Sequence, residues 1–284
     1  MPNILTVRSD LPGQRRTTKV VVEGSPLELE APDLLILIHG YNNSVEKAQS
    51  SYSRFKDALR SATRPGGETR LGAVWEFHWP SDHPLGAISL ATYPVRVPEA
   101  ELVGVLLADF LTSRRPTQTI RIVAHSLGCR VALHAISAIQ TSGRTTGPRI
   151  ESLFLLAAAV PVTLCAKEPG RPYSRPLPGA SEYAFYSNRD RVLQMSFVPG
   201  QYLAGETGEA VGRQGAPADR WTSTMNTLLQ HKQYWGSAEV VRRIDTLVWI
   251  QPVRWIGQAR LPENDPTGEP RYLEERERAV RNPF

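Results

Sequence analysis

The sequence contains little cysteine and no long apolar run. Its 284 residues include two cysteines, Cys129 and Cys165, and this number excludes a disulfide framework and a zinc site built on several thiolates. The longest apolar stretch, residues 153–162, is about half as long as a membrane-spanning helix, and residues 1–19 lack the apolar core of a signal peptide. We therefore expect a cytoplasmic protein with no transmembrane segment.

Lysine is also scarce, although the chain is basic. The formal net charge is +5, with 33 lysines and arginines against 28 aspartates and glutamates, and only five of the basic residues are lysines. No basic run exceeds two arginines, and basic and aromatic residues do not alternate as they do in nucleic-acid-binding segments. We expect no nucleic-acid partner. The arginine excess is compatible with a substrate that carries a phosphate or carboxylate, or with a phospholipid headgroup.

The six histidines are not spaced as a metal site requires. No two of them form an H-x-x-x-H or H-E-x-x-H pattern. An alternative would be a cluster of His39, His78 and His83 with Asp82. The spacing favours a protein without a metal.

The length and the order of apolar segments predict a single α/β domain over residues 1–284. Its core covers about residues 20–245, with possible lid segments at 80–98 and 167–181 and a C-terminal extension at 246–284. Continuous apolar runs are typical of strands buried on both faces of a parallel sheet that helices cover on both sides. We expect strands at 20–22, 27–29, 34–38, 73–79, 120–125 and 152–160, a further strand from 182 that ends before Asp190, and helices at 45–61, at 99–112 and directly after Ser126.

Ser126 lies at the most informative point of the chain. A β-branched run ends in Ala124-His125-Ser126-Leu127-Gly128, and apolar residues then recur at helical spacing. This order predicts a strand, a sharp turn and a helix, with the serine at the turn and small residues two positions before and after it. Such a turn projects the hydroxyl toward a base, as a nucleophile requires. Alanine in place of the commoner glycine at position 124 is a modest departure from the pattern.

A second loop follows the buried strand at 34–38. It begins His39-Gly40-Tyr41, in the position where hydrolases built on parallel sheets supply one oxyanion donor. We expect the backbone N–H groups of Tyr41 and Leu127 to form the oxyanion hole. His39 is expected to brace this loop.

The acid and the base are predicted from chain order. Asp190 follows a predicted strand at the edge where open α/β sheets carry their sites, and Asp219 is the alternative acid. In this class of enzyme the order is serine, acid, histidine, and His231 is the one histidine beyond Asp190. The expected catalytic groups are therefore Ser126, Asp190 and His231.

The chain resembles the α/β-hydrolases, and within them a little-characterised bacterial group. The resemblance rests on the loop H-G-Y-N-N-S at 39–44, W-P-S-D at 79–82 and A-H-S-L-G at 124–128, with the acid and histidine further on, and it covers about residues 30–240. It implies an α/β-hydrolase fold, a Ser-His-Asp triad and no cofactor. We expect the substrate pocket to be bordered by His39, Gly40, Asn42, Trp79 and His125.

The expected reaction is hydrolysis of a small-molecule carboxylic ester. A thioesterase, an amidase or an acyltransferase would use the same groups. A binding module that keeps the fold without catalysis is the alternative from another class. The sequence indicates no oligomeric state.

Overall fold

The computed structural model describes residues 2–62, 72–83, 92–116, 118–143, 147–217, 221 and 223–250. Its centre is an eight-stranded sheet in the order β2-β1-β4-β3-β5-β6-β7-β8. β1 and β2 are antiparallel, and all other neighbours are parallel, which confirms the predicted mostly parallel α/β architecture. The strands are β1 (Asn3–Thr6), β2 (Val21–Glu23), β3 (Asp33–Ile38), β4 (Ala73–His78), β5 (Thr119–His125), β6 (Arg149–Leu156), β7 (Ser181–Tyr186) and β8 (Ser223–Asn226).

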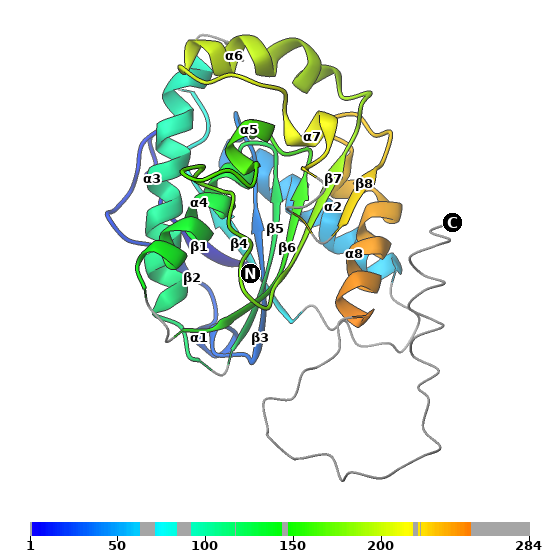
Figure 1. The fold of residues 1–284 in the computed structure, drawn as a ribbon. Helices are drawn as coiled ribbons and strands as arrows, with labels where there is room; N and C mark the ends of the chain where they lie inside the picture. Colours follow the sequence, from blue (N-terminus) through cyan, green and yellow to red (C-terminus); the bar gives the residue numbers. More distant parts are fainter. Residues whose placement is uncertain are drawn as a thin grey trace, which may run out of the picture.

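Helices cover both faces of this sheet. α3 and α4 pack together on one face, and α2 and α8 pack together on the other (Figure 1). The helices are α1 (Pro26–Leu29), α2 (Val45–Ala62), α3 (Tyr93–Thr112), α4 (Gly128–Thr141), α5 (Val162–Cys165), α6 (Val198–Leu203), α7 (Val211–Gln214) and α8 (Ala238–Ile250), with a π-helix at Leu193–Phe197 and a 3-10 turn at Tyr234–Gly236. Within the described residues, no helix combines the length and apolarity needed to cross a bilayer.

The central strands are buried on both faces, as their apolar runs predict. Every residue of β3 after Asp33 and every residue of β5 after Thr119 is buried. The one charged side chain among them, Arg121, pairs with the carboxylates of Asp33 and Glu151. α2 runs over Val45–Ala62, and its buried side includes Tyr52, Phe55 and Leu59. These elements agree with the predictions because each is specified by its own local pattern.

The expected strand at 27–29 is wrong. Pro26–Leu29 is a short helix, and β2 pairs with β1 and not, as expected, with a strand at 27–29. Proline at the start of this segment has the backbone angle of a first helical turn and no N–H for a strand ladder. Leu29 is buried while Leu27 is 85 % exposed, so the segment does not alternate in the way a strand would.

Two other boundaries differ from the sequence prediction. α3 begins at Tyr93 and not at residue 99, because Pro94 fits the first turn and the helix continues through Pro98. β6 ends at Leu156 and not at residue 160, since Ala157 adopts a positive φ of 45° and turns the chain out of the strand.

The two expected lid segments are only partly described. Residues 84–91 lie outside the described residues, and 93–98 form the start of α3. Residues 167–181 form turns that lead into β7, and the buried Tyr173 packs against His134 there. In the C-terminal extension, residues 246–250 complete α8, and 251–284 lie outside the described residues.

Candidate active site

Ser126 lies between β5 and α4 in a strained backbone conformation. Its φ is +56°, a region that residues other than glycine rarely adopt. Its N–H donates to the carbonyl of Leu156 at 2.9 Å, and its carbonyl accepts from Ala159 at 3.1 Å. Ala124 stays in the strand and is not among the positive-φ residues, so alanine there is compatible with the turn.

Gly128 and Gly40 allow the two loops around Ser126 to touch. A Cβ on Gly128 would lie 2.3 Å from the carbonyl oxygen of His39. A Cβ on Gly40 would lie 2.6 Å from the Cβ of Ser126. The absence of side chains at both positions brings the loop that carries Tyr41 directly against the turn that carries Leu127.

The side chains of Ser126, His231 and Asp190 form one chain of hydrogen bonds. His231 Nε2 is 2.9 Å from Ser126 Oγ, and His231 Nδ1 is 2.8 Å from Asp190 Oδ2. Asp190 is fully buried, and its other oxygen accepts the N–H of Leu193 at 3.0 Å. The structure thus brings together three residues that are 64 and 41 positions apart in sequence. The alternative acid, Asp219, lies outside the described residues.

Parallel strand order explains this convergence. Ser126 follows β5, Asp190 follows β7 and His231 follows β8, and these strands lie in the same half of the sheet. Their carboxyl ends meet at one edge, where side chains from separate loops can contact one another.

His125 ties the loop of His231 to the strand of Ser126. Its Nε2–H donates to the backbone carbonyl of His231 at 2.7 Å, and the two rings are 4.9 Å apart. Burial, assisted by the neighbouring His231, lowers the pKa of His125 to about 3. His125 is therefore neutral at pH 7, and this bond places its one ring proton on Nε2. His125 was expected to border the pocket, but its contact with the loop of His231 was not predicted.

His39 braces its own loop. Its Nδ1–H donates to the carbonyl of Gly40 at 3.0 Å, and its Nε2 accepts the N–H of Trp79 at 3.2 Å. The indole of Trp79 stacks on the imidazole and donates to the His39 carbonyl at 2.8 Å. Burial holds the pKa of His39 well below its ordinary value, and nearby His78 acts in the same direction. The neutral ring fits these two bonds.

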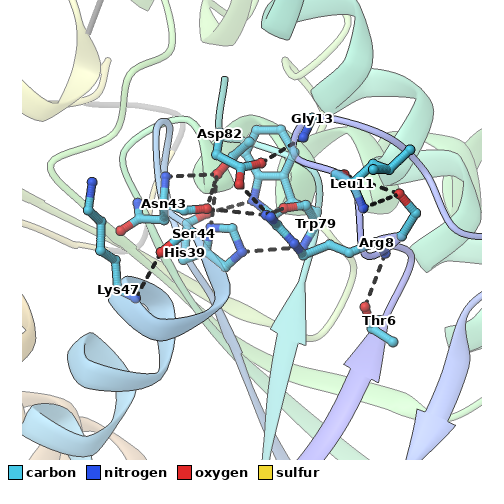
Figure 2. Close-up of polar contacts among 12 residues, drawn as sticks. Thr6, Arg8, Leu11, Gly13, His39, Asn43, Ser44, Lys47, Trp79 and Asp82 are labelled. Atoms are coloured by element: carbon cyan, nitrogen blue, oxygen red, sulfur yellow. Dashed lines mark hydrogen bonds and ion pairs between the residues drawn. The ribbon is translucent and has the colours of Figure 1, made fainter. Parts of the chain in front are cut away.

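Arg8 and Asp82 extend this bracing to the N-terminal strand, as Figure 2 shows. Arg8 is ion-paired with Asp82 at 2.6 Å and donates to the carbonyls of Trp79 at 2.9 Å and Asn43 at 3.2 Å. The other oxygen of Asp82 accepts the N–H of Gly13 at 2.9 Å. The segments at 39–44 and 79–82 are therefore one hydrogen-bonded unit. No local pattern in the sequence indicates the part played by Arg8.

A cavity of about 860 Å³ opens beside Ser126 and His231. Of the residues expected to border the pocket, Asn42 and His125 line this cavity, as does Tyr41, whereas His39, Gly40 and Trp79 are not among its lining residues. Leu127 is fully buried at the start of α4. Among the described residues, no three His, Cys, Asp or Glu side chains are grouped as a metal site would need.

Solved structures of low sequence identity resemble the chain. The product of gene lin2722 from Listeria innocua is 11 % identical, with a TM-score of 0.43, over 75 % of this chain and 92 % of that one. YbtT, a type II thioesterase of the yersiniabactin biosynthetic pathway, is 12 % identical, with a TM-score of 0.39, over 76 % and 91 % of the two chains. Polyneuridine aldehyde esterase is 10 % identical, with a TM-score of 0.38, over 76 % and 99 %.

A family model gives the assignment that these similarities are too weak to carry. No curated protein matches the sequence. The model described as "alpha/beta hydrolase of unknown function (DUF900)" matches residues 27–246, which contain the whole site. The sheet order, the turn at Ser126 and this match agree, and the chain belongs to the DUF900 family of alpha/beta hydrolases.

Proposed function

We propose that the protein is a serine hydrolase that cleaves a carboxylic ester through an acyl-enzyme intermediate. The observation that carries this proposal is the hydrogen-bonded series Asp190, His231, Ser126, with the serine at a positive φ beside a cavity. This geometry joins a nucleophile to a base, and the base to an orienting carboxylate.

In the first half of the reaction, Ser126 Oγ attacks the ester carbonyl while its proton passes to His231 Nε2. Asp190 holds the Nδ1–H and stabilises the imidazolium that forms. The backbone N–H groups of Tyr41 and Leu127 are assigned to the oxyanion, since the two loops that carry them meet at Ser126. As the carbon–oxygen bond to the alcohol breaks, His231 gives its proton to the departing oxygen.

In the second half of the reaction, water takes the place of Ser126 as the attacking nucleophile. Its proton goes to His231 Nε2, its oxygen attacks the acyl group on Ser126, and the collapse of the intermediate returns the proton to Ser126 Oγ. The acid is released and the enzyme is regenerated without a redox step. A thioester or an amide would follow the same route with a sulfur or nitrogen leaving group.

The test is labelling with a fluorophosphonate, peptide mapping and a panel of esters, thioesters and amides. We expect label on Ser126 in the wild type and none in Ser126→Ala. His231→Ala is expected to lower kcat about 10⁶-fold and Asp190→Asn about 10⁴-fold, by analogy with other triads. Ser53→Ala, at an exposed serine of α2, is the matched control and is expected to retain activity.

The result that contradicts the proposal is equally definite. A folded wild-type protein that neither labels at Ser126 nor cleaves any member of the panel is not a serine hydrolase. The cavity would then be that of a binding module.

A further inference from the structure

The cavity beside Ser126 has one basic wall. Lys47 and Arg54 of α2 and Lys232 of the His231 loop all line it, against a single carboxylate, Glu46. A hydrogen bond from the hydroxyl of Ser44 and one from the Glu46 backbone lower the pKa of that carboxyl. Glu46 is therefore engaged at the start of α2, and the wall as a whole is positively charged.

The three cations are available to a ligand. In the described part of the chain, no carboxylate lies within ion-pair distance of Lys47, Arg54 or Lys232, and the one side-chain partner of Arg54 is the hydroxyl of Ser51 at 3.2 Å. All three side chains are exposed. Most arginines that the fold uses for packing are paired instead, as Arg121 is with Asp33 and Glu151.

A second wall of the cavity is aromatic, and its residues lie outside α2. Tyr93 contacts Tyr41 edge-on at 5.6 Å and Phe197 at 6.5 Å between ring centroids, and all three line the cavity. Tyr41 belongs to the loop assigned to the oxyanion, so this wall begins at the place where the carbonyl of the substrate would lie. It suits an apolar chain.

The position of His231 decides which half of an ester faces which wall. His231 must reach the departing oxygen to protonate it, so the alcohol half lies on the side of its loop. Lys232 follows His231 directly, and Trp235 of the same loop packs edge-on against Tyr52 and Phe55 of α2. The loop of the base is thus joined to the helix that carries Arg54, and the acyl half is left to the aromatic wall.

We propose that the substrate is an ester of an apolar carboxylic acid with an alcohol that bears a carboxylate or phosphate, and that Lys47, Arg54 and Lys232 bind this anion. The inference rests on the proposed serine hydrolase function and adds its substrate class. Hydrolysis of such an ester requires no co-reactant other than water.

The experiment compares two hexanoate esters that differ in one charge. One has 3-hydroxybenzoate and the other 3-hydroxybenzamide as the leaving group, so size and shape are matched. The measured quantity is the ratio of their kcat/KM values, because differences in intrinsic reactivity cancel between protein variants. We expect each exposed charge to contribute about threefold to this ratio, and the triple variant Lys47→Gln, Arg54→Gln, Lys232→Gln to lower it about twenty- to thirtyfold.

The matched control lies on the same helix. Arg60 is about 9 Å further along α2 than Arg54 and pairs with Asp57. Arg54→Gln and Arg60→Gln remove the same charge, and we expect only the first to lower the ratio. Raising the salt to about 0.5 M shortens the range of electrostatic attraction to a few ångströms and should lower the wild-type ratio as well. Circular dichroism melting verifies that each variant is folded.

Three results overturn the inference. One is an unchanged ratio in the folded triple variant. Another concerns a 3-hydroxybenzamide ester whose carboxylate is at the far end of the acyl chain. If its kcat/KM falls as much in the triple variant as that of the 3-hydroxybenzoate ester, the cations do not distinguish the alcohol half from the acyl half. A protein that labels at Ser126 and cleaves both hexanoates without regard to charge loses this inference alone, whereas one that neither labels nor cleaves loses the proposed function too.

Discussion

Replacing Asp82 with alanine tests how the loop at 39–44 is held. Asp82 is the one carboxylate that pairs with Arg8 in the described structure, and the exposed fractions of the two side chains are 11 % and 7 %. Without Asp82, Arg8 keeps the carbonyls of Trp79 and Asn43 but no counter-charge. Gly13 also loses the acceptor of its N–H.

The expected loss of stability follows from this burial. Removing one partner of a buried ion pair costs about 3–5 kcal/mol, and the two remaining carbonyls place this case near the lower limit. With a loss of about 3 kcal/mol and an m-value of about 3 kcal/mol/M, the urea midpoint falls by about 1 M. Because Arg8 also holds the carbonyl of Asn43 within the loop at 39–44, we expect kcat/KM for any cleaved ester to fall as well.

The assay is urea unfolding followed by tryptophan fluorescence, in a double-mutant cycle with Arg8→Met. The double variant removes both charges, so we expect it to be about 2 kcal/mol more stable than the sum of the single losses implies. Asp57→Ala is the control, because its pair with Arg60 is exposed and should contribute less than about 1 kcal/mol. Strict additivity of Arg8→Met and Asp82→Ala would refute the reasoning.

Two further predictions concern Gly128 and His125. Gly128→Ala places a Cβ 2.3 Å from the His39 carbonyl oxygen, so we expect a loss of about 3 kcal/mol and a Tm lower by several degrees. Gly147→Ala, whose nearest atom would be 3.9 Å away, should change Tm little, and equal shifts would contradict the steric argument. The pKa of His125 is about 3 in the folded chain against 6.5 for an unperturbed histidine, so the unfolded state binds more protons between these values. The free energy of unfolding should therefore fall as the pH drops from about 6.5, by up to about 1.4 kcal/mol per pH unit. In His125→Asn it should fall less steeply. Urea unfolding at a series of pH values measures both slopes, and equal slopes would contradict this assignment.

Local pattern specified much of this fold. β3, α2 and the turn at Ser126 could be predicted because each depends on residues within about twenty positions of one another. Asp190 and His231 were predicted from chain order, and the structure places them within hydrogen-bond distance of each other and of Ser126. Their catalytic role is the proposal that the labelling experiment tests.

Contacts between distant segments could not be predicted. Arg8 and Asp82 are 74 residues apart, and His125 and His231 are 106 apart. Neither pair leaves a periodic trace in the sequence, because a single side chain meets a single partner across the sheet edge. The pairing of β1 with β2 was also missed, because the four residues of β1 are too short a run to predict a strand and only the folded sheet brings Ile4 opposite Glu23.

The contact at Gly40 and Gly128 has a consequence for variation in this family. Each glycine faces the segment that the other belongs to, so a side chain gained at one position would have to be accommodated by movement of the opposite backbone. We therefore expect the loop at 39–44 and the turn at 124–128 to change together among related sequences. A loop transplanted from a relative should function here only when the matching turn is transplanted with it.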